Sequence, residues 1–134
     1  MPHVSNKKLK KDHLAHLYRR LVFSLEKTGK KSATIKFLNE FLTQTEKIML
    51  AKRFSVIYLL SRGLPVSYIA EALRMSPATI YRMSLKSEAG KYSFLNRAMK
   101  ELDESIWDAL EKILRAGLPP KAGRGRWKFL YSRK

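Results

Sequence analysis

The chain of 134 residues has no cysteine, which excludes disulfide bonds, thiolate nucleophiles and cysteine-based metal sites. Long apolar runs are also missing. The longest candidate, residues 56–60, is far shorter than the ~18 residues that a membrane span needs. The basic N-terminus lacks the apolar block of a signal peptide. We therefore expect a cytoplasmic protein without a membrane segment.

Residues that support catalysis are scarce as well. The chain has three histidines, and His13 and His16 are three residues apart, a spacing that can chelate a metal ion. No further ligand accompanies them, so surface or partly buried histidines are the simpler interpretation. The acidic residues of segment 103–111 belong to one expected helix and indicate a solvated face. Because no phosphate-binding loop or nucleophile motif is present, we predict that the protein is not an enzyme and has no metal site.

Acidic residues are few, at 11 against 28 Lys and Arg, which leaves a net charge of +17. Residues 1–31 have nine basic and two acidic side chains, and residues 117–134 have six basic and none acidic. Residues 91–116 have five of each. An excess at the two ends is typical of arms that lie along a polyanion. Nucleic acid is the favoured partner; a generic basic surface, an anionic membrane or ribosomal RNA are the alternatives.

Apolar residues recur at three- and four-residue steps through most of the chain, which predicts an all-α protein. We expect a first helix over about residues 8–26 and a short helix, capped by Ser32, that ends near residue 41. "KSEAGKYS" at 86–93 is expected to be a loop. One long helix, capped by Ser93, should follow and reach residue 116. Its apolar stripe would be formed by Leu95, Ala98, Leu102, Ile106, Ala109 and Ile113.

The central helix has clear signals at both ends. Thr43 followed by Glu46 is a capping box that begins it, and Gly63 with Pro65 beyond ends it. We divide the chain into a basic N-terminal arm (1–7), a helical domain (8–116) and a basic C-terminal tail (117–134). One chain of this length has more apolar helix faces than it can cover, which predicts a homodimer. A compact monomeric bundle is the alternative.

Residues 66–84, "VSYIAEALRMSPATIYRMS", have the pattern of a helix-turn-helix. Ala70 supplies the small residue where two helices cross, and Met75 supplies the apolar residue that fills the turn. Ser76 with Pro77 begins the second helix. Arg74 stands where such a turn favours glycine, because the backbone there is commonly left-handed. The inward-facing apolar residues would be Ile69, Leu73, Ile80 and Met83.

The second helix of this unit exposes residues suited to duplex DNA. Arg82 has the geometry for a bidentate contact with guanine, and Ala78 for the thymine methyl group. The hydroxyl groups of Ser76 and Thr79 suit phosphate oxygens. A helical corner in an unrelated bundle is the alternative. The DNA-binding residues predicted from this segment are Ser76, Pro77, Ala78, Thr79, Tyr81, Arg82 and Lys86.

Three motifs in this order resemble the Trp repressor family: "FLTQTEKIMLAKR" at 41–53, "LLSRG" at 59–63 and "PATIYR" at 77–82. The resemblance covers about residues 8–84. It implies a Trp-repressor-like helical bundle that forms an intertwined homodimer. It also implies binding to the major groove of a two-fold operator in double-stranded DNA and repression of transcription.

The resemblance also implies an effector pocket. In tryptophan-responsive members the indole ring lies between two arginines, which correspond to Arg53 and Arg82, and two threonines correspond to Thr43 and Thr79. Met83 stands where that pocket has glycine, and the helix-turn-helix is one residue shorter. The sequence therefore leaves open whether L-tryptophan or another small effector binds. A helical wheel alone turns Arg82 towards DNA, and Arg53 has a structural ion pair as its alternative role.

The C-terminal tail, "GRGRWKFLY" at its centre, combines basic and aromatic residues. Arg124 and Arg126 are flanked by glycine and could enter a narrow minor groove. Aromatic rings could also stack on unpaired bases. The favoured interpretation of the aromatic residues is that Trp127, Phe129 and Leu130 dock on the body of the protein while the basic groups face water.

Together these features predict a sequence-specific DNA-binding transcriptional regulator of repressor type. A protein that packages nucleic acid without sequence preference, or a basic RNA-associated protein, is the main alternative. The DNA-binding subunit of a recombination or transposition system is another. A specific site about 10³-fold tighter than random DNA would separate the regulator from a packaging protein.

Overall fold

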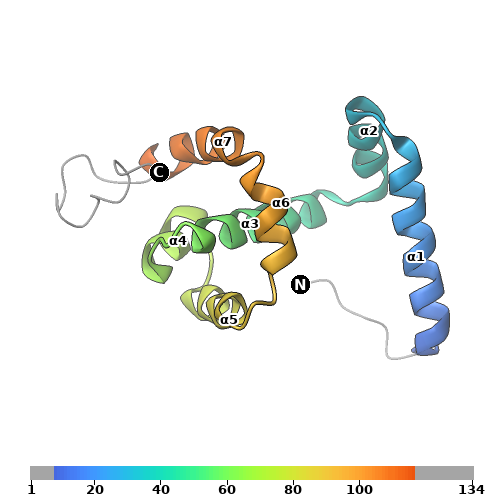
Figure 1. The fold of residues 1–134 in the computed structure, drawn as a ribbon, viewed down its shortest axis with the longest axis horizontal. Helices are drawn as coiled ribbons and strands as arrows, with labels where there is room; N and C mark the ends of the chain where they lie inside the picture. Colours follow the sequence, from blue (N-terminus) through green and yellow to red (C-terminus); the bar gives the residue numbers. More distant parts are fainter. Residues whose placement is uncertain (1–7, 117–134) are drawn as a thin grey trace. The chain divides into compact units, whose positions relative to one another are not determined.

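The structure is a computed structural model that describes residues 8–116. This part of the chain consists of helices joined by short turns and loops and contains no strand, so the all-α prediction is confirmed (Figure 1). Arg124 and Arg126 lie outside the described residues. The helices are α1 (Lys11–Thr28), α2 (Lys31–Phe41), α3 (Gln44–Ser61), α4 (Val66–Leu73), α5 (Pro77–Glu88), α6 (Ser93–Lys100) and α7 (Asp103–Ala116).

The chain forms two compact units that divide after Leu50, within α3. In the first unit α1 and α2 form a helical hairpin. Its turn contains Gly29, whose φ of 65° is a left-handed conformation that glycine adopts without strain. The hydroxyl groups of Thr28 and Thr34 lie 2.8 Å apart across this turn. Neither α1 nor α2 has a buried residue, so the hairpin has no core of its own.

The predicted ends of α3 are confirmed. The backbone N–H of Thr43 donates to the Glu46 carboxylate at 2.9 Å, and the N–H of Glu46 donates to the Thr43 hydroxyl at 3.1 Å. This reciprocal pair satisfies two donors that a helix start would leave unpaired. At the other end Gly63 has a φ of 81°, which allows the chain to leave the helix sharply.

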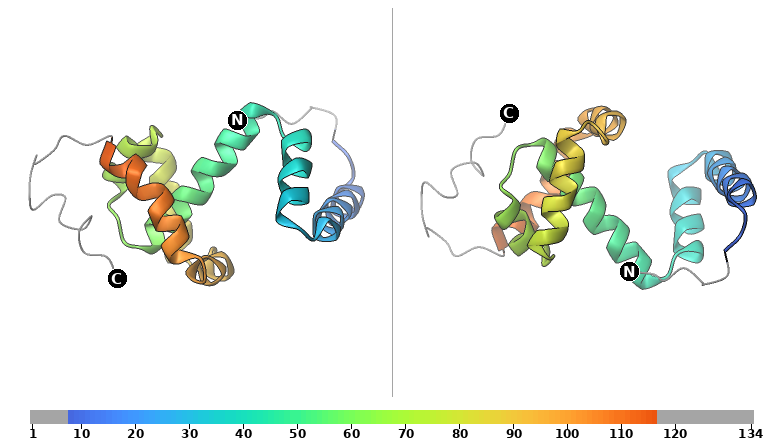
Figure 2. Two further views of the ribbon diagram at one scale, coloured as in Figure 1. Left: turned by 90° about the horizontal axis from the view of Figure 1, so that it is seen from above. Right: turned by 90° about the horizontal axis from the view of Figure 1, so that it is seen from below.

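The hydrophobic core lies in the second unit. Four consecutive residues of α3 (56–59) are buried, as expected for a helix that is covered on several sides. They pack with buried residues of α4, α5, α6 and α7, of which Trp107 of α7 is the largest. In Figures 1 and 2, α4 lies between α7 on one side and α5 on the other. The fully buried side chains are Val56, Tyr58, Leu59, Ile69, Ile80, Trp107 and Leu114.

Two predicted boundaries are wrong. Ser32 does not cap α2: the helix begins at Lys31, and Lys30 occupies the N-cap position without a side-chain hydrogen bond. The segment expected to be a loop at 86–93 is partly helical, because α5 continues to Glu88. Gly90, with a φ of 78°, marks the turn that follows. Both errors concern helix ends, which fray and whose assigned boundaries commonly differ by one or two residues.

The predicted long helix over 93–116 is also wrong. The chain forms two helices, α6 and α7, with a break at Glu101 and Leu102. Ser93 is the first residue of α6 and its hydroxyl donates to the Gly90 carbonyl. The break turns a different face of α7 to the core, because it buries Trp107, Leu110 and Leu114. It leaves Leu102 and Ile113 of the expected stripe exposed.

Among the described helices, none combines the length and the apolar character that crossing a membrane requires. Residues 8–116 also bring no three His, Cys, Asp or Glu side chains together as a metal-binding group. His13 and His16 are both exposed on α1.

Candidate nucleic-acid interface

The turn between α4 and α5 is a tight left-handed corner. Arg74 ends α4 with φ 54° and ψ 55°, the left-handed conformation that the sequence pattern requires at this position. Its N–H donates to the carbonyls of Ala70 and Glu71, and the N–H of Met75 donates to Ala70 at 2.9 Å. These bonds satisfy the last carbonyls of α4. A non-glycine residue in this conformation costs about 1–2 kcal/mol.

Lys52 of α3 contacts this corner. Its ammonium group lies 3.4 Å from the carbonyl oxygen of Arg74 and donates to it. The carbonyl would otherwise point away from any helical partner, because the chain has left α4 here. This contact joins residues 22 positions apart, and no local pattern in the sequence could have indicated it.

The packing of α4 against α5 agrees with the predicted positions. Ile69, Ala70 and Leu73 of α4 are buried, and Ile80 of α5 is fully buried against them. Met75 and Met83 are partly buried at the edge of the same core. This arrangement fixes which side of α5 faces inward and therefore which side faces solvent.

The start of α5 presents a polar end to solvent. Ser76 occupies the N-cap position and Pro77 is the first helical residue, as predicted, although the Ser76 side chain makes no capping hydrogen bond. The first turn of a helix has N–H groups without intrahelical partners and the positive end of the helix dipole. The first turn of α5 contains no acidic residue. This end of α5 therefore suits an anion such as a phosphate group.

The outward face of α5 has the predicted composition. Tyr81 is 57% exposed, and Ala78, Arg82, Leu85 and Lys86 are exposed on the same side. The guanidinium of Arg82 donates to the Thr79 hydroxyl at 3.3 Å. This bond directs the arginine along the exposed face near the start of the helix.

The four residues of the proposed effector pocket have different surroundings. Thr43 belongs to the first unit, where its hydroxyl accepts from the Glu46 N–H. Arg53 is exposed on α3 in the second unit, and Thr79 and Arg82 bond to each other on α5. Two open grooves lie on the α1–α2 hairpin, and none of these four residues lines either groove.

A polar network at the C-terminal end of α3 was missed by the sequence interpretation. Asp103, expected on a solvated face, accepts from the Tyr58 hydroxyl at 2.6 Å and pairs with the Arg62 guanidinium at 3.1 Å. The Arg62 guanidinium also lies over the Trp107 ring, 4.4 Å from its centroid. Burial raises the pKa of Tyr58 to about 12, and the hydrogen bond to Asp103 adds to this while Arg62 opposes it.

The helix α5 follows α4 across a tight turn and has one exposed side, an arrangement that is also found in helix-turn-helix proteins that bind DNA. The chain belongs to the Trp repressor family: the family model described as Trp repressor protein matches residues 17–103. This family consists of DNA-binding regulators, as the sequence resemblance predicted. Comparisons with curated proteins and with solved structures give no match. The family match ends at the first residue of α7.

Proposed function

We propose that the protein is a sequence-specific transcriptional regulator of repressor type that reads duplex DNA with α4 and α5 as a helix-turn-helix. The observation that carries this proposal is the orientation of α5. Ile80 is fully buried against α4, so the opposite side, with Tyr81 and Arg82, is exposed from the first turn onward. A recognition helix contacts base edges with exposed residues near its N-terminal end.

Each exposed residue of α5 has a chemical role in this proposal. Arg82, directed by its bond to Thr79, donates two hydrogen bonds to a guanine in the major groove. Ala78 contacts a thymine methyl group, and Tyr81 contacts the sugar or base beside it. Ser76 and Lys86 contact phosphates and thereby set the position of α5 along the groove.

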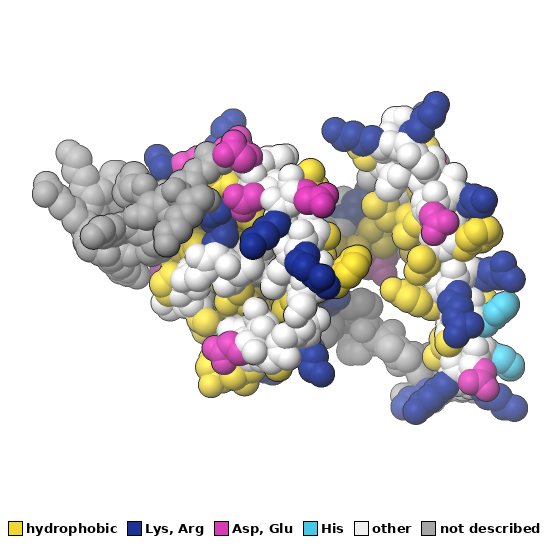
Figure 3. All heavy atoms as spheres, in the orientation of Figure 1, with side chains coloured by type: hydrophobic (Ala, Val, Ile, Leu, Met, Phe, Trp, Pro, Cys, Tyr) yellow, Lys and Arg dark blue, Asp and Glu magenta, His cyan; other side chains and the backbone are white. Residues whose placement is uncertain are grey.

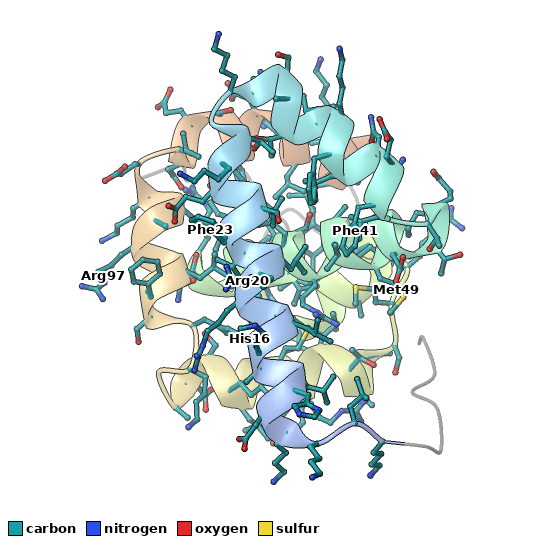
Figure 4. The ribbon with its side chains drawn as sticks, turned by 90° about the vertical axis from the view of Figure 1, so that its right-hand side faces the viewer. His16, Arg20, Phe23, Phe41, Met49 and Arg97 are labelled. Carbon is teal, nitrogen blue, oxygen red and sulfur yellow. The ribbon has the colours of Figure 1, made fainter. Side chains whose placement is uncertain are left out.

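We propose further that the regulator is a homodimer. The α1–α2 hairpin leaves large apolar side chains in solvent, and they are visible in Figure 3 beside Lys and Arg side chains. Figure 4 labels two of them, Phe23 on α1 and Phe41 at the end of α2. An apolar surface this extensive on helices that have no buried residue is typical of an obligate interface. Its members are Leu14, Leu17, Tyr18, Val22, Phe23, Ile35 and Phe41, each at least 44% exposed.

A second copy of the chain is the occupant that fits this surface. A closed two-fold dimer would cover the hairpins of both chains in one interface and leave none exposed. It would also present two copies of α5 to one duplex. The operator would then have two-fold symmetry with half-sites about one helical turn apart.

Selection of bound duplexes from a random pool tests the proposal. We expect enrichment of a palindrome that binds about 10³-fold more tightly than random DNA at the same salt concentration. Without an enriched sequence the proposal fails. A steep salt dependence, about −0.9 in the log–log slope per phosphate contact, with equal affinity for all duplexes would favour nucleic-acid packaging. Preference for RNA would favour an RNA-associated protein.

A further inference from the structure

The last helix, α7, begins at the last residue that matches the family model and contributes heavily to the core. Trp107 is 1% exposed and Leu114 is fully buried, and both pack in the cluster that includes α3 and α4. This core supports α4. Of the helices that pack against α5, α4 makes the most extensive contact. The orientation of α5 therefore depends on α7 through α4.

The contact between α7 and α4 includes a polar bond near the end of α7. The hydroxyl of Tyr68, a buried residue of α4, lies 3.4 Å from the Leu114 carbonyl oxygen and donates to it. Because α4 lies between α7 and α5 (Figures 1 and 2), α7 contacts the side of α4 that is opposite α5. It can stabilise α4 without covering the surface that we propose binds DNA.

The start of α7 is attached to α3 by the polar network. Asp103, the first residue of α7, pairs with Arg62 and accepts from Tyr58. The side chains of Arg62 and Asp103 are only 14% and 29% exposed, so water screens their attraction less than at an open surface. Arg62 also covers the Trp107 ring, which joins the charged pair to the apolar contacts of α7.

We propose that α7 is a brace that positions the reading helix. The brace consists of Asp103, Trp107 and Leu114, which hold α4 against α3 and thereby keep α5 in the orientation that fits the major groove. This inference rests on the proposed function. These three are positioning residues, since none lies on the exposed face of α5. Pre-orientation of a binding element lowers the entropy lost on binding, so the brace increases affinity for the specific site.

The substitution Asp103→Asn tests the brace, with Glu111→Gln as its matched control. Both changes remove one negative charge from α7, so they change the net charge of the protein equally. Glu111 pairs only with Arg115 along the same helix among the ion pairs that the structure describes, at 2.7 Å. Hydrogen exchange of the free protein is measured by mass spectrometry. Affinities are measured for the selected duplex and for random DNA at one salt concentration.

We expect Asp103→Asn to raise amide exchange in α4 and α5 at least fivefold relative to Glu111→Gln, because these helices open more often without the brace. Affinity for the selected duplex should fall about fivefold or more, while affinity for random DNA should be the same in the two variants. Equal exchange in α4 and α5 of both variants would overturn the inference. So would increased exchange spread evenly over α3–α7 with specific affinity unchanged, since that would show a general structural role.

If Asp103→Asn does not fold, Tyr58→Phe provides the second variant. It removes one donor to Asp103 and leaves the Arg62 pair and the Trp107 contact in place. The same local increase in exchange is expected, to a smaller degree, and its absence would overturn the inference. If the wild-type protein shows no preference for any duplex, the proposed function fails. The exchange comparison in the free protein still tests whether α7 orders α4 and α5.

Discussion

At the scale of single residues, α5 separates buried from exposed side chains clearly. Ile80 is fully buried, and its neighbours Tyr81 and Arg82 are exposed. The bond from Arg82 to Thr79 keeps the guanidinium on the outer face of the helix. A substitution of Arg82 should therefore change DNA binding and leave folding almost unaffected.

We predict that Arg82→Ala weakens binding to the selected operator by about 1–3 kcal/mol and relaxes specificity at one base pair in each half-site. The reason is the loss of a bidentate contact to one guanine. Fluorescence anisotropy with the operator and with single-base variants measures this. Arg97→Ala, which removes an exposed arginine of α6, is the control and should retain specificity. Equal losses on every duplex would contradict a base contact by Arg82.

Arg74 gives a second prediction at this scale. Arg74→Gly should raise the free energy of unfolding by about 0.5–1 kcal/mol, because relief of the left-handed strain exceeds the entropy that glycine adds to the unfolded chain. Urea denaturation followed by circular dichroism is the measurement. Arg53→Gly, within α3, should destabilise the protein by about 1 kcal/mol and serves as the control. A destabilised Arg74→Gly variant would mean that the arginine side chain makes a contact worth more than the strain.

At the scale of helices, the sequence predicted those with strong local signals. The capping box of Thr43 and Glu46, the left-handed Gly63 and the first-turn Pro77 all mark boundaries that the structure confirms. The spacing of apolar residues in 66–84 likewise identified the buried sides of α4 and α5. Such signals act within a few residues and can be read without knowledge of tertiary contacts.

The break between α6 and α7 could not be predicted in this way. No glycine or proline stands at residues 101 and 102, so nothing local ends the helix there. The direction of α7 depends on burial of Trp107 and on the pair of Arg62 with Asp103, which are 41 positions apart. Burial of a large aromatic side chain outweighs the modest gain from continuing one helix.

The network at the start of α7 gives a pH-dependent prediction. The pKa of Tyr58 is raised from 10.0 to about 12 in the folded protein, so folding favours the neutral phenol. The stabilisation is fully present below pH 10 and is lost as the pH rises from 10 towards 12. Tyr58→Phe should therefore be less stable than wild type by about 1 kcal/mol at pH 8, and the difference should shrink above pH 10. Thermal denaturation at a series of pH values measures this, and a constant difference up to pH 12 would contradict it.

At the scale of the whole molecule, the two units differ in whether they have a hydrophobic core. The second unit has a core of its own, with every fully buried side chain of the described residues in 51–116. The first unit has no buried residue in α1 or α2, and several of its large apolar side chains are exposed. The net charge of +17 favours association with DNA and opposes self-association. The proposed dimerisation would therefore rest on apolar contacts of the hairpin.

We predict that Leu17→Glu converts the dimer to a monomer, because it places a charge in the apolar surface of α1. His16→Glu is the matched control: it changes the charge of α1 nearly equally at an exposed position that lines neither hairpin groove. Sedimentation velocity should show the dimer mass for wild type and His16→Glu and the monomer mass for Leu17→Glu. A monomeric wild type at micromolar concentration would refute the proposed dimer.

Mapping the residues that contact DNA tests most directly whether α5 is the reading helix. Backbone amide NMR spectra of the full chain are recorded during titration with the selected duplex and, separately, with a random duplex of the same length. We predict that the amides of residues 76 and 78–86, at the start and along the exposed face of α5, show the largest shift changes, and that these changes are larger with the selected duplex. Amides of residues 104–115 in α7 should change least. Shift changes concentrated on α1 or on the terminal arms, identical for both duplexes and absent from α5, would contradict the claim that α5 reads the DNA sequence.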